Sequence, residues 1–231
     1  MAALHNNAPV ETLLVLKDRD DSKVKDLLRV AKAKGIVIRF ESRSTLDDYG
    51  RSHQGIVALL ATDEAALPET TLTELIAGAK HKLILVLDGV TDPHNLGACV
   101  RSAEALGADG VVIPKDKSAS VTPVVHKTSA GASQIIPIVS VTNLADALKQ
   151  LQAAGFWIVG LAGEADTLIQ EIDFSTPTAL VLGSEGGGLR RLTKEHCDFL
   201  AKIQLAGQTE SLNVSVASGI ALFEVARQRA V

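Results

Sequence analysis

The stretch IQLAGQTESLNVSVASGIALFEVARQR, residues 203–229, carries the most specific pattern of the sequence. An apolar run ends at Gly207, and a polar turn leads into Ser211, Leu212 and Asn213. The residues that follow are mostly small or apolar, and they favour a helix with Asn213 as its N-cap. Small side chains let another backbone or a ligand come close. The stretch therefore predicts a tightly packed turn and helix beside a neighbour that it does not itself identify.

The composition favours a buried sheet. Of 231 residues, 46% are hydrophobic but only 3% are aromatic, so a core of Leu, Val, Ile and Ala is expected, as in parallel sheets covered by helices. The sequence shows no membrane-length apolar run and no secretory segment, and we expect no membrane partner. Cys99 and Cys197 lie far apart without a CxxC motif, which favours free thiols and a cytoplasmic location. The net charge of −4 argues against broad nucleic-acid binding but leaves specific binding open.

The N-terminal part predicts a small β-α-β-α-β unit. Strands are expected at 11–17, 36–40 and 56–61, with a helix over 22–34 that ends at Gly35. Polar and basic side chains gather in its second half: Arg39, Arg43, Arg51, His53 and Gln54. They form either a solvated rim or a small RNA-docking face. The polar segment 62–70 contains Pro68, so we expect a domain at 1–62, a linker at 63–79 and a second domain at 80–231.

From Lys82 onward, strand and helix patterns alternate. Strands are expected at 83–88, 110–114, 135–139, 156–161, 179–183 and 199–205, and helices at 92–106, 122–131, 143–154 and 189–196. A capping box at Thr71 and Glu74 predicts a further helix from Leu72. This alternation predicts an α/β fold with a parallel sheet flanked by helices. Ligands of such sheets bind beyond the carboxyl ends of strands, so the loops after Asp88, Gly183 and Leu205 are the candidate site.

The first of these loops offers Asn95 near a helix start and Arg101 about two turns later, with Gly97 clearing space on the face of Arg101. Alternatively, Arg101 pairs with Glu104 on a wet surface. His94 is a less favoured general base.

The second loop, GSEGGG at 183–188, is neither GxGxxG nor a P-loop. Its glycines expose backbone groups, and Glu185 suits a ligand with hydroxyl, amino or positively charged groups better than a phosphate. An ordinary tight turn is the alternative. Because His196, Cys197 and Asp198 are adjacent rather than spaced around one ion, no metal is expected.

Three segments together resemble the SpoU family of RNA 2′-O-ribose methyltransferases, within the SPOUT superfamily. They are LDGVTDPHNLGACVRSAEALGADGVV, LVLGSEGGGLRRL and IQLAGQTESLNVSVASGIALFE, in the family's order. The N-terminal unit resembles that family's substrate-binding domain, and HQGIVA at 53–58 matches its end. The family's opening turn and helix are not recognisable in MAALHNNAPVE. Because this segment belongs to the RNA-docking domain, the difference from the family bears on that domain and not on the predicted methyl transfer.

The resemblance implies S-adenosyl-L-methionine as methyl donor, a C-terminal trefoil knot and a homodimer through the knot region, with the cofactor sites at the subunit contact. It implies a cofactor pocket and a catalytic set. The pocket consists of Gly183, Glu185, Gly186, Ile203 and Leu212, and the catalytic set of Asn95, Arg101, Glu185, Ser211 and Asn213. Arginine is effectively never deprotonated, so we assign Arg101 to the developing alkoxide or a neighbouring phosphate.

The predicted function is 2′-O-methylation of a guanosine in 23S ribosomal RNA, with no DNA partner. Two alternatives stay open: a transfer-RNA guanosine 2′-O-methyltransferase, and a non-catalytic RNA-binding protein on the same fold. The basic residues Lys115, Lys117 and Lys127 either line the RNA path or face water.

Overall fold

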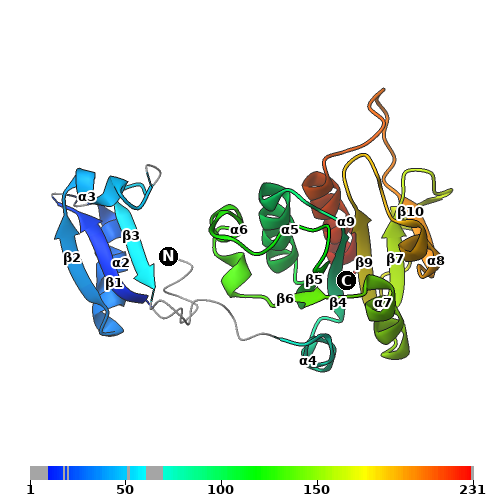
Figure 1. Ribbon diagram of the computed structural model, residues 1–231, viewed down its shortest axis with the longest axis horizontal. Helices are drawn as coiled ribbons and strands as arrows, with labels where there is room; N and C mark the ends of the chain where they lie inside the picture. Colours follow the sequence, from blue (N-terminus) through cyan, green and yellow to red (C-terminus); the bar gives the residue numbers. More distant parts are fainter. Residues whose placement is uncertain (1–9, 18, 20, 51–52, 61–69, 230–231) are drawn as a thin grey trace. The chain divides into compact units, whose positions relative to one another are not determined.

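The computed structural model describes residues 10–17, 19, 21–50, 53–60 and 70–229. The chain forms two compact units, Met1–Leu67 and Pro68–Val231. Figure 1 shows both with their labelled elements. Helix α4 (Leu72–Gly78) begins with the predicted capping box, and its Leu72 and Leu75 are buried in the second unit. The segment 72–78, which we placed in the linker on sequence grounds, therefore packs as part of that unit.

The first unit contains a three-stranded sheet with a helix on one side. Its elements are β1 (Val10–Leu16), α2 (Ser22–Ala33), β2 (Val37–Glu41), α3 (Arg43–Asp47) and β3 (Ile56–Leu60). The strand order is β2-β1-β3, with β1 parallel to β2 and antiparallel to β3. Leu13 and Val15 of β1 pack against Val24, Leu27 and Ala31 of α2, because these helix positions share one face.

The second unit is built on a seven-stranded sheet in the order β6-β5-β4-β9-β7-β10-β8. The strands are β4 (Leu83–Asp88), β5 (Gly110–Pro114), β6 (Ile138–Val141), β7 (Trp157–Leu161), β8 (Thr167–Leu168), β9 (Thr178–Gly183) and β10 (Phe199–Lys202). Every pairing between them is parallel. All six residues of β4 are buried, as expected for a central strand covered on both faces.

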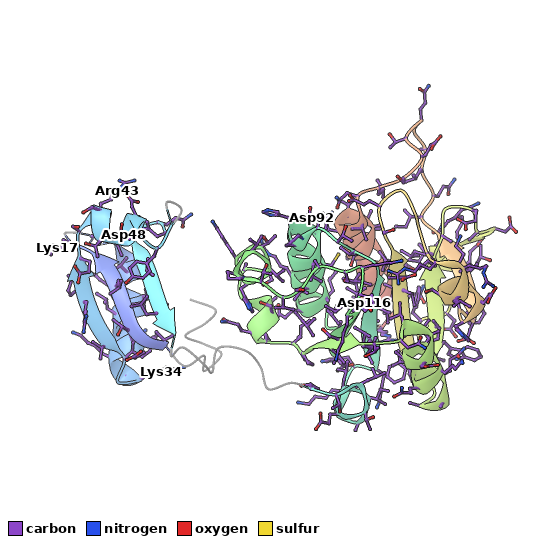
Figure 2. The ribbon with its side chains drawn as sticks, viewed as in Figure 1. Lys17, Lys34, Arg43, Asp48, Asp92 and Asp116 are labelled. Atoms are coloured by element: carbon purple, nitrogen blue, oxygen red, sulfur yellow. The ribbon has the colours of Figure 1, made fainter. Side chains whose placement is uncertain are left out.

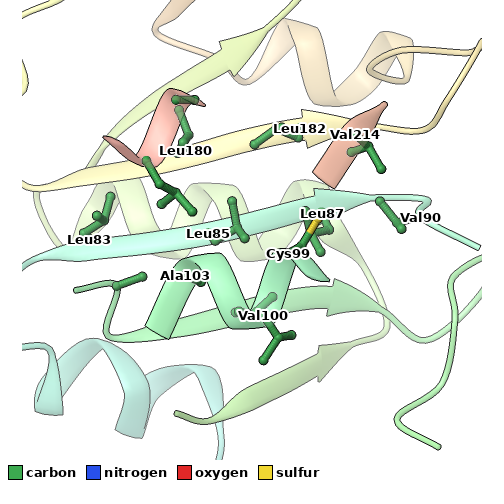
Figure 3. Packing of buried hydrophobic residues seen from close by; sticks show 14 of the residues in the cluster. Leu83, Leu85, Leu87, Val90, Cys99, Val100, Ala103, Leu180, Leu182 and Val214 are labelled. Carbon is green, nitrogen blue, oxygen red and sulfur yellow. The ribbon is translucent and has the colours of Figure 1, made fainter. Parts of the chain in front are cut away.

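Helices cover both faces of this sheet. They are α5 (Pro93–Ala105), α6 (Pro123–Thr128), α7 (Leu144–Ala153), α8 (Arg191–Glu195) and α9 (Val214–Arg229), with short 3₁₀ turns η1 (Ala132–Gln134) and η2 (Ile169–Glu171). Leu83, Leu85 and Leu87 of β4 face α5 and α9, and Figure 3 shows this cluster. The alternate residues Ile84 and Val86 pack with α4 and α7. The predicted parallel α/β architecture is confirmed.

Several predicted boundaries were wrong. The strand expected at 135–139 is β6 at Ile138–Val141, because Ile135 closes the turn η1 and Pro137 has no N–H to donate. The helix expected at 122–131 ends at Thr128. The last strand stops at Lys202 rather than 205, since Ala201 already pairs with Leu161, the last residue of β7. The short strand β8, which pairs with β10, was not predicted.

The C-terminal end of α9 is hydrogen-bonded to the segments that precede the central strands. The Arg229 guanidinium donates hydrogen bonds to the carbonyl oxygens of Phe174 (2.7 Å), His81 (2.6 Å) and Thr176 (2.7 Å). The side chain is half-buried, and this burial lowers the pKa of Arg229 from its ordinary value. With its C-terminal end held there, α9 runs along the sheet and presents its N-terminus at the carboxyl edge.

None of the helices in the described part of the chain combines the length and the apolar character that crossing a membrane requires.

Candidate active site

Three polar side chains from distant parts of the sequence meet at the carboxyl edge of the large sheet. The Asn213 Nδ2 atom lies 3.0 Å from Asn95 Oδ1 and also donates to Glu185 Oε1. Asn95 Nδ2 donates to the same Glu185 oxygen at 3.1 Å. We call Asn95, Glu185 and Asn213 the amide–carboxylate trio. It unites all three loops that the sequence selected.

The helix starts explain how the two asparagines are held. The Asp92 carboxylate accepts from the backbone N–H of His94 (2.9 Å), and Pro93 occupies the first turn, so α5 begins where predicted and carries Asn95 in that turn. Asn213 caps α9, because its Oδ1 accepts from the Ser215 N–H at 2.9 Å. With Oδ1 engaged in the cap, the NH₂ group of Asn213 is directed at Glu185 and Asn95.

The glycine-rich loop brings Glu185 to the start of α9. Ser184 and Gly188 pair through two backbone hydrogen bonds of 3.1 and 2.9 Å, which closes the loop. A Cβ on Gly183 would lie 2.0 Å from the Gly188 carbonyl carbon, so no other residue fits there without a backbone shift. The Glu185 carboxylate also lies 3.4 Å from the Val214 N–H, where the helix dipole favours a negative charge.

A cavity of about 340 Å³ opens beside the trio. Its walls come from the ends of β7, β9 and β10 and from the segment before α9. The residues predicted to hold the cofactor, Gly183, Glu185, Gly186, Ile203 and Leu212, all line it, and so does Ser211. Apolar side chains and exposed backbone groups thus surround a space with a carboxylate at one side. Such walls suit a ligand that combines an apolar ring with a separate positively charged group.

An ion pair with one fully buried partner joins the glycine-rich loop to β4. Asp88, the last residue of β4, is fully buried, and its Oδ2 accepts from the Arg190 backbone N–H at 2.8 Å. The Arg190 Nε lies 3.3 Å from the other carboxylate oxygen. This contact fixes the far end of the loop that carries Glu185. The contact was not predicted from the sequence, although an ionisable residue at the end of an otherwise apolar strand indicates a buried partner.

Two residues of the first predicted loop lie apart from the trio. Arg101 is exposed on α5, and no hydrogen bond or ion pair of the described residues joins it to Asn95, Glu185 or Asn213. The alternative Arg101–Glu104 ion pair is not formed either; both residues are described. Gly97 faces α6 rather than Arg101, since a Cβ on it would lie 2.7 Å from Thr128 Cβ. Its role is helix packing.

The predicted RNA-docking residues of the first unit differ in exposure. Arg39 and Arg43 are exposed, and Figure 2 shows Arg43 with Lys17 and Asp48 at the end opposite Lys34. The His53 ring is buried: Nε2 contacts Asp47 at 2.9 Å and Nδ1 accepts from the Gly55 N–H. Both ring nitrogens are therefore occupied within the unit. Gln54 is exposed, with a positive φ of 47°. Arg51 lies outside the described residues.

In the second unit Lys115, Lys117 and Lys127 are exposed. No group of three or more His, Cys, Asp or Glu side chains among the described residues could hold a metal ion. Cys99 and Cys197 are free thiols. Burial raises the pKa of each to about 12, with a smaller contribution from nearby carboxylates.

Both units match known sequence families. Residues 82–223 match the SpoU rRNA Methylase family, and residues 1–66 match the domain described as RNA 2′-O ribose methyltransferase substrate binding. The chain belongs to the SpoU rRNA methylase family, as its motifs predicted.

Its relatives include two curated enzymes. The 23S rRNA (guanosine-2′-O-)-methyltransferase RlmB of Coxiella burnetii is 53% identical over 219 residues, which cover 94% of this chain and 87% of that protein. The RlmB of Pseudomonas aeruginosa is 47% identical over 227 residues, covering 97% and 91%. Among solved structures, the SpoU methyltransferase AviRb from Streptomyces viridochromogenes in complex with AdoMet matches with a TM-score of 0.77 at 28% identity, covering 99% of this chain and 87% of that one.

Proposed function

We propose that this protein transfers a methyl group from S-adenosyl-L-methionine to the 2′-oxygen of a guanosine in 23S ribosomal RNA. The observation that carries the proposal is the amide–carboxylate trio at the edge of the 340 Å³ cavity. The proposed substrate is taken from relatives about half identical to this chain, which are named 23S rRNA (guanosine-2′-O-)-methyltransferases.

The cavity fits the methyl donor. Leu212 and Ile203 offer apolar surface for the adenine ring, and Gly183 lines the same cavity without a side chain. Glu185 places a carboxylate where a sulfonium charge is stabilised. When bound, S-adenosyl-L-methionine supplies an electrophilic methyl group. No metal ion is part of this proposal.

The trio and Ser211 position the acceptor hydroxyl. Asn95 and Asn213 are held by helix starts and by their shared carboxylate, so their amides are preorganised before RNA binds. Asn213 donates both amide hydrogens to Asn95 and Glu185 and so holds them in place, whereas Asn95 keeps one amide N–H that can orient a nucleophile and stabilise the negative charge that develops on it. Arg101, which is exposed and does not contact the trio, is proposed to bind the developing alkoxide or a neighbouring phosphate of the bound RNA.

The first unit is proposed to dock the ribosomal RNA, and the exposed Arg39 and Arg43 are proposed to contact it. In the second unit Lys115, Lys117 and Lys127 are proposed to follow the phosphate backbone. The two domains are proposed to be 1–62 and 80–231, with helix α4 from the segment between them packed against the second. Ribosomal RNA as substrate and free thiols fit a cytoplasmic location.

A homodimer is proposed through the outer face of α9. Val216, Ile220 and Phe223 share one face of this helix and are 49%, 40% and 59% exposed. An apolar helix face of this kind is typical of an interface, and a second copy of the same helix complements it by symmetry. A Phe223→Asp substitution should give monomers in analytical ultracentrifugation, whereas unchanged dimers would exclude this face.

The C-terminal trefoil knot is proposed from the path of the chain. After β10 the segment 203–213 returns across the ends of β7 and β9, and α9 then packs against α5. Mechanical unfolding from both ends should leave an extension shorter than that of a fully straightened chain if the knot is present.

The function is tested with labelled S-adenosyl-L-methionine, 23S rRNA lacking modification, and unmodified transfer RNA. Nucleoside analysis of the products should show 2′-O-methylguanosine in the 23S rRNA alone. Label in transfer RNA alone would show that the substrate is a transfer RNA. No label in either RNA would favour a non-catalytic RNA-binding protein. Sequencing of the labelled fragment maps the acceptor nucleotide.

A further inference from the structure

The first unit carries its two large aromatic side chains at its surface. Residues 1–67 contain one Phe, one Tyr and no Trp, and the side chains of Phe40 and Tyr49 are 51% and 55% exposed. The interior of the unit is aliphatic instead, with Leu13, Val15 and Leu46 buried. A small unit gains much from burying an aromatic ring, so two exposed rings indicate contact with a partner.

Both rings lie at one end of the unit. The Lys17 N–H donates to the Glu41 carbonyl oxygen at 2.9 Å, so the parallel strands β1 and β2 end together. Phe40 is the last residue but one of β2, and Tyr49 follows the C-cap of α3, the helix that leaves this end of β2. Figure 2 shows the charged residues at this end: Lys17, Arg43 and Asp48.

The backbone that carries the two rings is held in place. Phe40 belongs to β2, which is paired with β1 along its whole length. The Tyr49 N–H donates to the carbonyl oxygen of the fully buried Leu46 at 3.1 Å. The His53 ring, whose Nε2 lies 2.9 Å from Asp47, ties the end of α3 to the turn before β3. Because an ordered backbone presents both rings, binding through them costs little conformational entropy.

Exposed rings beside basic side chains suit unpaired RNA. Every nucleobase has a flat face that stacks on an aromatic ring, whereas a duplex keeps these faces covered. Arg43 and Lys17 are exposed at the same end and can neutralise phosphates next to a stacked base. Asp48 is an exposed acid beside Tyr49, so the phosphates should follow the side of the two cations.

We propose that Phe40 and Tyr49 stack on unpaired bases of the ribosomal RNA and that Arg43 binds a phosphate beside them. The first unit then recognises a single-stranded element rather than a duplex. The inference rests on the proposed function, in which this unit docks the RNA, and it adds the class of RNA element and the residues that contact its bases.

The first experiment measures binding of the full chain to a short single-stranded RNA of mixed sequence and to the duplex of that strand with its complement. Phe40→Leu and Tyr49→Leu keep an apolar side chain but remove the ring. Each should raise the Kd for the single strand by about tenfold and leave the Kd for the duplex unchanged. Phe40→Tyr and Tyr49→Phe keep a ring and should bind as the wild type does.

Val37→Ala is the matched control, because Val37 is 50% exposed at the opposite end of β2 and should not affect RNA binding. Undiminished binding of the single strand by both leucine variants would overturn the proposal, and so would equal losses for the single strand and the duplex. A changed oligomeric state with unchanged RNA affinity would also overturn it, since the rings would then belong to a protein interface.

Salt dependence separates stacking from charge. Arg43→Gln should make the slope of the logarithm of the binding constant against the logarithm of salt concentration shallower by about 0.7, the value for one phosphate of a single strand. The leucine variants should keep the wild-type slope, because stacking releases no counterions. A slope unchanged by Arg43→Gln would exclude the phosphate contact.

The second experiment reports on one ring directly and needs no catalysis. The chain contains a single Trp, so Tyr49→Trp combined with Trp157→Phe places the only indole at position 49. Stacking should quench its fluorescence with the single strand and not with the duplex. Absence of quenching would overturn the inference even if 23S rRNA is methylated. Quenching by the single strand without methyl transfer to any RNA would count against the proposed function alone.

Discussion

Asn213 donates from its side-chain amide to Asn95 Oδ1 at 3.0 Å, across 118 residues of sequence, while its own Oδ1 caps α9. One side chain thus starts a helix and holds the trio together. The two roles can be separated, because only the NH₂ group contacts Asn95 and Glu185.

An Asn213→Asp substitution keeps the cap oxygen and removes the NH₂ donors. It also places a second carboxylate beside Glu185. We expect single-turnover methyl transfer to fall by roughly 100-fold, because the trio loses the donor that holds Asn95 and Glu185 together. Repulsion between the two carboxylates should also lower the melting temperature. Asn213→Ala loses the cap too and should cost about 1 kcal/mol of stability. A wild-type rate for Asn213→Asp would show that the Asn213 amide is not needed for methyl transfer.

A Glu185→Gln substitution tests the charge beside the cofactor cavity. The positively charged sulfonium of S-adenosyl-L-methionine should lose affinity by about fivefold, since a partly exposed charge pair contributes up to about 1 kcal/mol. S-adenosylhomocysteine has a neutral sulfur and should bind as before. Calorimetric titration of both ligands provides the comparison. An equal loss for both would mean that Glu185 shapes the loop without sensing the charge.

A Gly183→Ala substitution places a Cβ 2.0 Å from the Gly188 carbonyl carbon. Because a backbone shift is required, the protein should lose about 1–3 kcal/mol of stability and bind S-adenosyl-L-methionine poorly. Gly163 lines the same cavity but has nothing within 4 Å of a built Cβ. Gly163→Ala is therefore the matched control and should retain both properties. Chemical unfolding and calorimetry measure the two effects, and equal behaviour of the two variants would contradict the steric account.

An Asp88→Ala substitution leaves the Arg190 N–H without its buried acceptor and the guanidinium without its counter-ion. Arg190 is 44% exposed on its side chain, so we expect a loss of about 1–3 kcal/mol rather than the larger cost of a fully buried pair. Removing the exposed pair by Arg191→Ala should change stability by less than about 0.5 kcal/mol. Urea unfolding distinguishes the two. Similar small losses would show that the Asp88 contact does not hold the loop.

The two buried thiols predict a loss of stability in alkali. The pKa of Cys99 and of Cys197 is raised to about 12 in the folded protein, whereas an unfolded thiol ionises near pH 8.5. Above pH 9 the unfolded state therefore binds fewer protons than the folded state, and stability falls as the pH rises towards 12. Between pH 9 and 10 each thiol should contribute a loss of about 1 kcal/mol. Unfolding curves at both pH values give the change in the free energy of unfolding. This change should be smaller for Cys99→Ala than for the wild type, and an identical change would exclude the Cys99 thiol as its source.

Short-range sequence patterns are sufficient to predict most of the local elements and the residues that carry the chemistry. The apolar run 83–88, the Asp92-Pro93 start and the capping box at Thr71 specify strands and helix starts through short-range physics, and the structure has them where expected. The three family motifs likewise named Asn95, Glu185 and Asn213 before any of them could be placed together.

Which of these residues come into contact depends on long-range packing. Whether Asn95 or Arg101 reaches Glu185 depends on the rotation of α5 against α6 and α9, and the packing of Gly97 on Thr128 sets that rotation. The end of β10 at Lys202 depends on where β7 stops. The Asp88–Arg190 contact spans 102 residues. Such contacts arise from the global packing of the sheet and its helices, and a pattern read along the chain carries no information on distances across it.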